Sequence, residues 1–167
     1  MKKVVLLIGI FFISYAQINA QDNVAEIAHA FIKAVKSNDL SVIEGRYLDV
    51  NAAYAVLPKE SAGMNSKQKN ETYIKPMYNR FSENFEKIQA QIKSGNINVR
   101  KIDLVSYKLG KIDPKAPEAK GKQKLPQAMS LFFNYNKKEH VIPISVVEID
   151  EHWYILEILY VTDLFKK

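Results

Sequence analysis

The feature that most constrains the fold is a change of hydrophobic period at Gly95. Before Gly95, apolar residues recur every three or four positions, which predicts a long amphipathic helix over about Asn70–Ser94. The apolar stripe of this helix consists of Ile74, Met77, Tyr78, Phe81, Phe85, Ile88 and Ile92. After Gly95, segments rich in Val, Ile and Tyr alternate with a period of two, as β-strands do. The chain is therefore predicted to place its helices before its sheet.

Four segments with the shorter period follow, and they predict four β-strands. These segments are Asn98–Leu109, Ala128–Tyr135, Val141–Ile149 and His152–Asp163. Short turns at residues 136–138 and 150–151 join the last three as antiparallel neighbours, whereas residues 111–125 contain Pro and Gly and predict a long loop. Pro143 lacks a backbone N–H, so we expect an edge strand or a bulge there. The predicted fold class is α+β, with helices packed on a C-terminal four-stranded antiparallel sheet.

The region before the long helix gives weaker signals. A first amphipathic helix is predicted up to about Lys36, and a short second helix up to about Tyr47. The segment Val50–Leu57 is apolar and Ala-rich, and its periodicity is compatible with a short strand or with an irregular wall. Residues 59–69 are polar and predict a loop.

The last predicted hairpin is apolar on both of its faces. With a two-residue loop at residues 150–151, Val147 lies opposite Tyr154. Continuing the alternation places Ser145 opposite Leu156. A sheet that is apolar on both sides needs cover on both sides, or it lines an internal cavity or a partner's surface. This pattern is the strongest hint of a ligand pocket in the sequence.

The first twenty residues have the organisation of a secretory signal peptide. Lys2 and Lys3 precede the apolar run Val4–Tyr15, and a small residue, Ala20, ends the segment. The run is shorter than the roughly 20 apolar residues that span a bilayer, so no stable membrane insertion is expected after cleavage. We therefore expect a signal peptide at 1–20, a single domain at 21–167, and a bacterial protein that is periplasmic or secreted.

Composition excludes several classes of chemistry. The chain has no cysteine, so disulfides, zinc–thiolate sites, iron–sulfur clusters and lipid anchors on cysteine are excluded. The formal net charge is +6, and much of the excess lies in the Lys-rich segment 108–124. That segment is either a solvated loop or an electrostatic contact for an anionic partner. Nucleic acid is not expected as a partner, because the segment has almost no interleaved aromatic residues.

The order of the predicted elements resembles that of the NTF2-like (cystatin-like α+β) superfamily. Two local stretches carry the resemblance: Ala28–Asp39, which looks like the first helix and turn of such domains, and Glu148–Ile155, an acidic turn before Trp. The resemblance covers about residues 22–163, and the 111–125 loop departs from it as an insertion. It implies a cone-shaped domain with a pocket between a curved sheet and its helices, and dimers through the open sheet face. It implies no single activity, since the fold hosts isomerases, dehydratases and binding modules.

A few residues are candidates for a site. An acid–base enzyme needs a carboxylate in a dry pocket, and Asp49 and Glu157 are the two candidates for this catalytic role. Tyr54, Tyr154 and Tyr160, together with Glu157, are candidates for ligand binding. Each has an ordinary structural alternative: Asp49 as a helix cap, Glu157 as a solvent-facing carboxylate, and the tyrosines as core aromatics.

Metal and cofactor sites are not expected. The three histidines, His29, His140 and His152, are too scattered for a metal site, and no nucleotide-binding or hydrolase motif is present. The sequence thus favours an exported, non-enzymatic module that binds a small apolar ligand, a peptide or another protein, and that can form a homodimer through its sheet face. The alternatives are an isomerase-like or dehydratase-like pocket enzyme, and a structural or interaction protein of the cell envelope.

Overall fold

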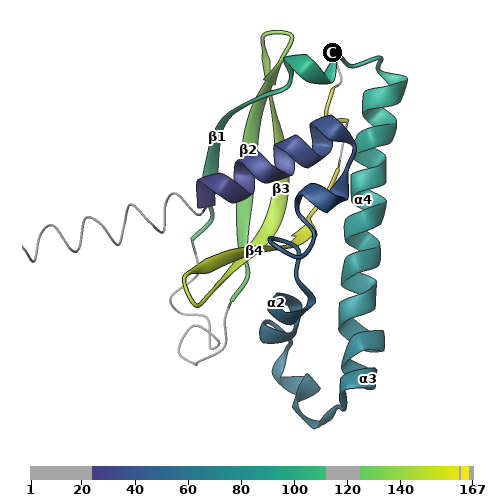
Figure 1. Ribbon diagram of the computed structural model, residues 1–167, viewed down its shortest axis with the longest axis vertical. Helices are drawn as coiled ribbons and strands as arrows, with labels where there is room; N and C mark the ends of the chain where they lie inside the picture. Colours follow the sequence, from purple (N-terminus) through teal and green to yellow (C-terminus); the bar gives the residue numbers. More distant parts are fainter. Residues whose placement is uncertain (1–23, 112–124, 162, 166–167) are drawn as a thin grey trace, which may run out of the picture.

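The computed structural model describes residues 24–111, 125–161 and 163–165. Helices precede a single four-stranded antiparallel sheet with the strand order β1-β2-β3-β4 (Figure 1). The predicted α+β class and the predicted order of helices before strands are confirmed. The signal peptide predicted at residues 1–20 and most of the predicted 111–125 loop lie outside the described residues.

The first helix agrees with its prediction, and the second is shorter than predicted. Within the described residues the N-terminal helix covers 24–37. It ends where Asn38 adopts a left-handed conformation with φ of 53°. The Asp39 side chain then caps only one 3₁₀ turn, η1 (Leu40–Val42), and residues 43–47 form turns in place of a second helix. The prediction of a helix up to Tyr47 was therefore wrong beyond this turn.

The ambiguous apolar segment is a helix, so both structures predicted for it were wrong. Helix α2 (Val50–Ala55) is capped by Asp49 and is followed by a 3₁₀ turn, η2 (Lys59–Gly63). The helix has only six residues, so its apolar positions do not repeat often enough to reveal a helical period. Its Ala-rich composition favours a helix intrinsically.

The long helix begins earlier than predicted and contains a widened turn. A reciprocal cap between Asn65 and Gln68 starts α3 (Ser66–Lys69), which continues through the π-helical turn η3 (Asn70–Ile74) into α4 (Lys75–Ser94). Pro76 follows this π-turn. Proline lacks the N–H and the space that a regular α-helical turn requires, which accounts for the widening. Part of the predicted 59–69 loop is therefore helical.

The four strands are joined as predicted, with shifted ends. They are β1 (Asp103–Leu109), β2 (Gln127–Tyr135), β3 (Lys138–Ile149) and β4 (His152–Ile158). The turns at residues 136–137 and 150–151 each have two residues of positive φ, as tight hairpins require. The first strand starts later than predicted because η4 (Val99–Lys101) is a 3₁₀ turn capped by Asn98.

The predicted register of the last hairpin holds near its turn and fails beyond it. Val147 lies opposite Tyr154 as predicted, but Ser145 lies opposite Glu157. Leu156 is the extra residue of a β-bulge, which shifts the pattern of faces along the rest of β4. The shift turns Ile158 into the main core.

Pro143 lies in a central strand, so the edge position was wrong, whereas a β-bulge, the alternative prediction, occurs two residues away at Ser145–Val146. It pairs with Ser130 of β2, and its carbonyl oxygen accepts the Leu159 N–H at 3.0 Å. Because Pro143 has no N–H to return, the ladder between β3 and β4 stops there. This explains why β4 ends at Ile158, although the sequence predicted a strand up to Asp163.

Both faces of the β3–β4 hairpin are covered, by different helices. The N-terminal helix and α4 pack on one face through a large core (Figure 1). Its largest fully buried side chains include Phe31, Phe81, Phe133, Ile144 and Ile155. On the other face, Ala52 of α2 packs with Val147 and Leu156 in a second, small cluster. The two-sided apolar pattern is thus satisfied at this end by the chain itself.

Candidate functional site

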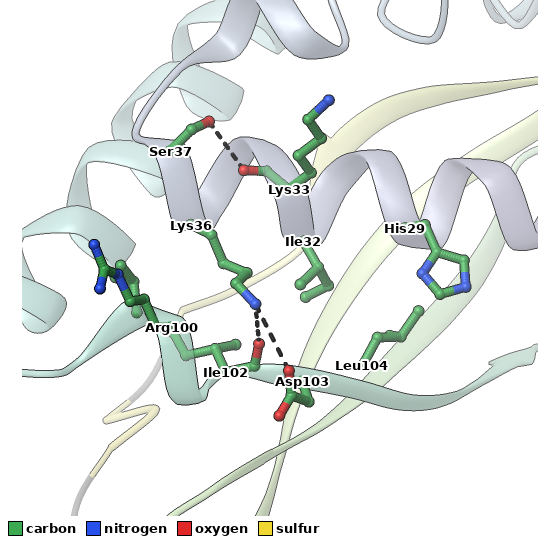
Figure 2. Close-up of a pocket in the computed structure, with 10 residues that line it drawn as sticks. His29, Ile32, Lys33, Lys36, Ser37, Arg100, Ile102, Asp103 and Leu104 are labelled. Atoms are coloured by element: carbon green, nitrogen blue, oxygen red, sulfur yellow. Dashed lines mark hydrogen bonds and ion pairs between the residues drawn. The ribbon is translucent and has the colours of Figure 1, made fainter.

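A groove of about 710 Å³ lies between the N-terminal helix and the segment that enters the sheet (Figure 2). One wall is formed by helix residues between His29 and Ser37. The other wall is formed by residues between Val99 and Leu104, from η4 and the start of β1. The volume falls within the range of about 300–1,000 Å³ that small-molecule sites occupy.

The spacing of the helix residues explains why the groove forms here. His29, Ile32, Lys33 and Lys36 follow one another at intervals of three, one and three residues, so they share one side of the helix. Phe31 belongs to another side, which is fully buried in the main core. The helix is therefore held on the sheet by one stripe and leaves the neighbouring stripe to line the groove.

The base of the groove is apolar. Ile32 from the helix and Ile102 from the second wall lie there almost completely buried, with only 4% and 1% of their surfaces exposed (Figure 2). Val99 and Leu104 are only half-buried, so they provide the apolar surface that a ligand can cover. This surface favours the aliphatic or aromatic part of a ligand.

Six polar residues line the groove around this apolar base, and three of them, Lys33, Lys36 and Arg100, are cations. The Lys36 ammonium donates to the Ile102 carbonyl oxygen at 2.7 Å and lies 3.7 Å from the Asp103 carboxylate. Within the described residues, Lys33 and Arg100 form no ion pair. The rim is therefore positively charged, and only the Lys36 charge is balanced by a carboxylate.

Asp49, one predicted catalytic residue, is the N-cap of α2 and does not line the groove. Its carboxylate accepts the Asn51 backbone N–H at 2.6 Å. Asp49→Ala is expected to lower the free energy of unfolding by about 1 kcal/mol, whereas Asp49→Asn should retain most of the cap. Urea unfolding of both variants checks this. Equal losses in the two variants would contradict the capping role.

Tyr78 of α4 lies near Asp49 and shows a strong electrostatic effect. Burial of the phenol, together with the negative charges of Asp49 and Glu44, raises the pKa of Tyr78 to about 12. The phenol therefore ionises less readily in the folded protein than in the unfolded chain. As a result, the free energy of unfolding falls as the pH rises from about 10 towards 12. A pH titration monitored by phenolate absorbance at 295 nm should show a step near pH 12 that Tyr78→Phe removes. Tyr160→Phe is the control and should keep that step.

Glu157, the other predicted catalytic residue, forms an ion pair between β4 and α4. Its carboxylate lies 2.7 Å from Nε of Arg80, and its side chain is 24% exposed. The neighbouring Asn84 donates to the Ile158 carbonyl oxygen at 2.7 Å, so the two contacts together fasten α4 to the end of β4. Glu157 does not line the groove either.

The three predicted ligand-binding tyrosines are not brought together. The Tyr54 hydroxyl donates to the Ser66 carbonyl oxygen at 3.4 Å, which links α2 to α3. Tyr154 is half-buried against the small cluster beside α2, and Tyr160 is 56% exposed after β4. None of the three lines the groove. The structure thus places the predicted residues on separate contacts.

The histidines have separate surroundings. His29 lines the groove, His140 stacks on Phe133 with 5.4 Å between ring centroids, and His152 bonds to the Asp150 carbonyl oxygen at 2.8 Å. In the part of the chain that the structure describes, no group of three or more His, Asp or Glu side chains could hold a metal ion.

The groove residues were not predicted from the sequence. The sequence predicts the first helix from its apolar stripe and places His29 off that stripe, without assigning it or its neighbours to a site. A signal was available in the helix itself, because Ile32 is an apolar residue within a stripe that otherwise carries His and Lys. The opposite wall depends on how the helix crosses β1, which local periodicity does not contain.

The comparisons with known proteins give no relative. No protein-family model, curated protein or solved structure matches the chain. Among the described residues, no helix has the length and apolar character needed to cross a membrane.

Proposed function

We propose that this chain is an exported, non-enzymatic binding module whose ligand site is the groove between the N-terminal helix and β1. The observation that carries the proposal is a groove of about 710 Å³ with an apolar floor and a polar rim. A binding role accounts for this arrangement without requiring a reacting group. The export signal predicted at residues 1–20 places the function in the periplasm or outside the cell.

The positions of the two candidate carboxylates favour binding over acid–base catalysis. Asp49 caps a helix and Glu157 pairs with Arg80, so each has a structural partner. A general base must reach the proton that it removes, and neither carboxylate lines the groove. Asp103 does line it, but Lys36 lies 3.7 Å from its carboxylate. The enzyme alternative is therefore the weaker proposal.

The proposal is tested by native mass spectrometry of residues 21–167, purified gently from a host that exports the protein. We expect a persistent added mass that denaturation releases, and its identity would give the ligand class. The control is Leu104→Trp, which places a large side chain in the second wall and should reduce the added mass. A bare protein mass in several hosts would contradict a small-ligand role.

A row of apolar side chains favours a second contact, between two copies of the chain. Phe132 and Val141 are cross-strand neighbours on the face of the sheet away from the main core, and Val105 lies next to Ser106, the β1 partner of Phe132; Val105 and Val141 are 51% and 37% exposed. Lys108 and Glu139 lie diagonally on opposite sides of Phe132. If two copies pack face to face around a two-fold axis at Phe132, Lys108 of one copy can lie against Glu139 of the other.

Size-exclusion chromatography with light scattering tests this second contact. The mature chain is expected to form a dimer that Val141→Asp dissociates, because a carboxylate would then be buried at the interface. The matched control is Val50→Asp, since Val50 is 43% exposed on α2, away from the row. A monomer at high protein concentration would contradict the contact.

We also propose that the domain is an NTF2-like one. The helices before the sheet and the sequential antiparallel order β1-β2-β3-β4 support this proposal. The long helical run from Ser66 to Ser94 is a departure from that family.

A further inference from the structure

The charges around the groove are unbalanced. Lys33, Lys36 and Arg100 line it against a single carboxylate, Asp103. Lys36 lies beside that carboxylate and also donates to the carbonyl oxygen of Ile102, just before β1, so its charge is already used within the protein. The unbalanced charge thus belongs to Lys33 and Arg100, and it favours an anionic ligand.

The two unbalanced cations differ in direction. Figure 2 shows the Lys33 side chain extending away from β1, and Arg100 lying at the same end of the groove as Ser37. Lys33 and Lys36 are in the last turns of the helix, where cations offset the partial negative charge of the carboxyl end, so the helix itself accounts for them. Arg100 comes from η4, on the opposite wall. Arg100 is therefore the cation best placed to meet a ligand.

The edge of β1 is poorly suited to pairing with an added strand. Lys36 already occupies the Ile102 carbonyl oxygen, and the register shift between Leu104 and Ser106 leaves Val105 as a bulge. A lysine and a bulge are two devices that protect edge strands from pairing. An extended peptide would therefore lose the regular main-chain hydrogen bonds that make strand addition strong. Recognition in the groove must depend mainly on side chains.

We infer that the groove binds a linear amphiphile with a single carboxylate group. The aliphatic part lies against Val99 and Leu104, the half-buried apolar residues of the lining, and the carboxylate faces the Arg100 guanidinium. The helix from His29 to Ser37 is about 12 Å long, from a rise of about 1.5 Å per residue, which suits a medium-length chain. This inference rests on the proposed binding function and names the ligand class of that same site.

Isothermal titration calorimetry of residues 21–167 with decanoate and with decanol tests the inference. Decanoate is expected to bind about tenfold more tightly than decanol, because a hydrogen bond to a charged group stabilises more than a neutral one. Arg100→Gln should remove this preference and leave decanol binding unchanged. The matched control Lys101→Gln removes the same charge from the next position of η4, which does not line the groove, and should change decanoate affinity by less than about twofold.

The other outcomes distinguish a wrong ligand class from a wrong binding site. Equal binding of decanoate and decanol, or equal losses in Arg100→Gln and Lys101→Gln, would overturn the carboxylate inference and leave the groove as a site. Tighter binding of an acidic peptide than of decanoate would also overturn it, in favour of a protein partner. If neither amphiphile binds, native mass spectrometry distinguishes two cases. A ligand retained on the purified protein would reject only this ligand class, whereas a protein without a retained ligand would also reject the binding function. Arg100→Lys keeps the charge and should restore part of the preference.

Discussion

Phe133→Ala is expected to lower the free energy of unfolding by about 3–5 kcal/mol, and Phe132→Ala by no more than about 1.5 kcal/mol. Phe133 is 1% exposed in the main core and stacks on His140, with the Phe165 ring 5.9 Å away. Phe132 is the next residue of β2 and points to the open face of the sheet, where it is only partly buried. The two variants remove the same atoms from opposite sides of one strand.

Urea unfolding followed by Trp153 fluorescence measures the difference. The chain has one tryptophan, and Trp153 is 6% exposed in the same core, so its emission reports on global unfolding. The m-values should agree between the variants, which shows that the same surface unfolds. Similar losses at the two positions would contradict the assignment of the faces, and with it the placement of the groove helix.

Phe31→Ala is the second large effect, again about 3–5 kcal/mol. Phe31 is fully buried on the N-terminal helix, and Ile27 and Val35 complete its buried stripe at 1% exposure each. Lys33→Ala on the same helix is the control, and it should change the free energy by less than about 0.5 kcal/mol because Lys33 is exposed. Since this helix forms one wall of the groove, the comparison also tests how firmly that wall is fixed.

Thermal unfolding of the two helix variants gives an independent reading. A loss of several degrees in Phe31→Ala with no change in Lys33→Ala would confirm that the helix belongs to the cooperative core. A separate, early transition of the helix in the unmodified protein would instead show that it is docked loosely. The groove would then lack a fixed wall.

The sheet was predictable to the extent that local chemistry determines it. The two-residue turn at 150–151 and the pairing of Val147 with Tyr154 follow from period and turn length alone. The bulge at Leu156 does not, because it depends on how β4 meets Pro143 and the helices. That one extra residue moves Ile158 into the main core and Glu157 towards Arg80.

The site was less predictable, for a related reason. Asp49 stands out in the sequence because it is near Tyr47 and Tyr54, and Glu157 because it interrupts an apolar strand face, but both carboxylates serve structural contacts. The groove instead depends on two segments about 70 residues apart, which meet where Lys36 contacts Ile102. The helix residues that line the groove can be recognised as part of a site only when the residues opposite them are known.

The proposed ligand site is the groove beside the N-terminal helix. Amide chemical-shift mapping locates the bound ligand, using ¹⁵N-labelled residues 21–167 titrated with decanoate or with a ligand released from the purified protein. We expect the largest shifts within residues 29–37 and 99–104. Shifts concentrated at residues 154–160, with the groove signals unchanged, would contradict this expectation.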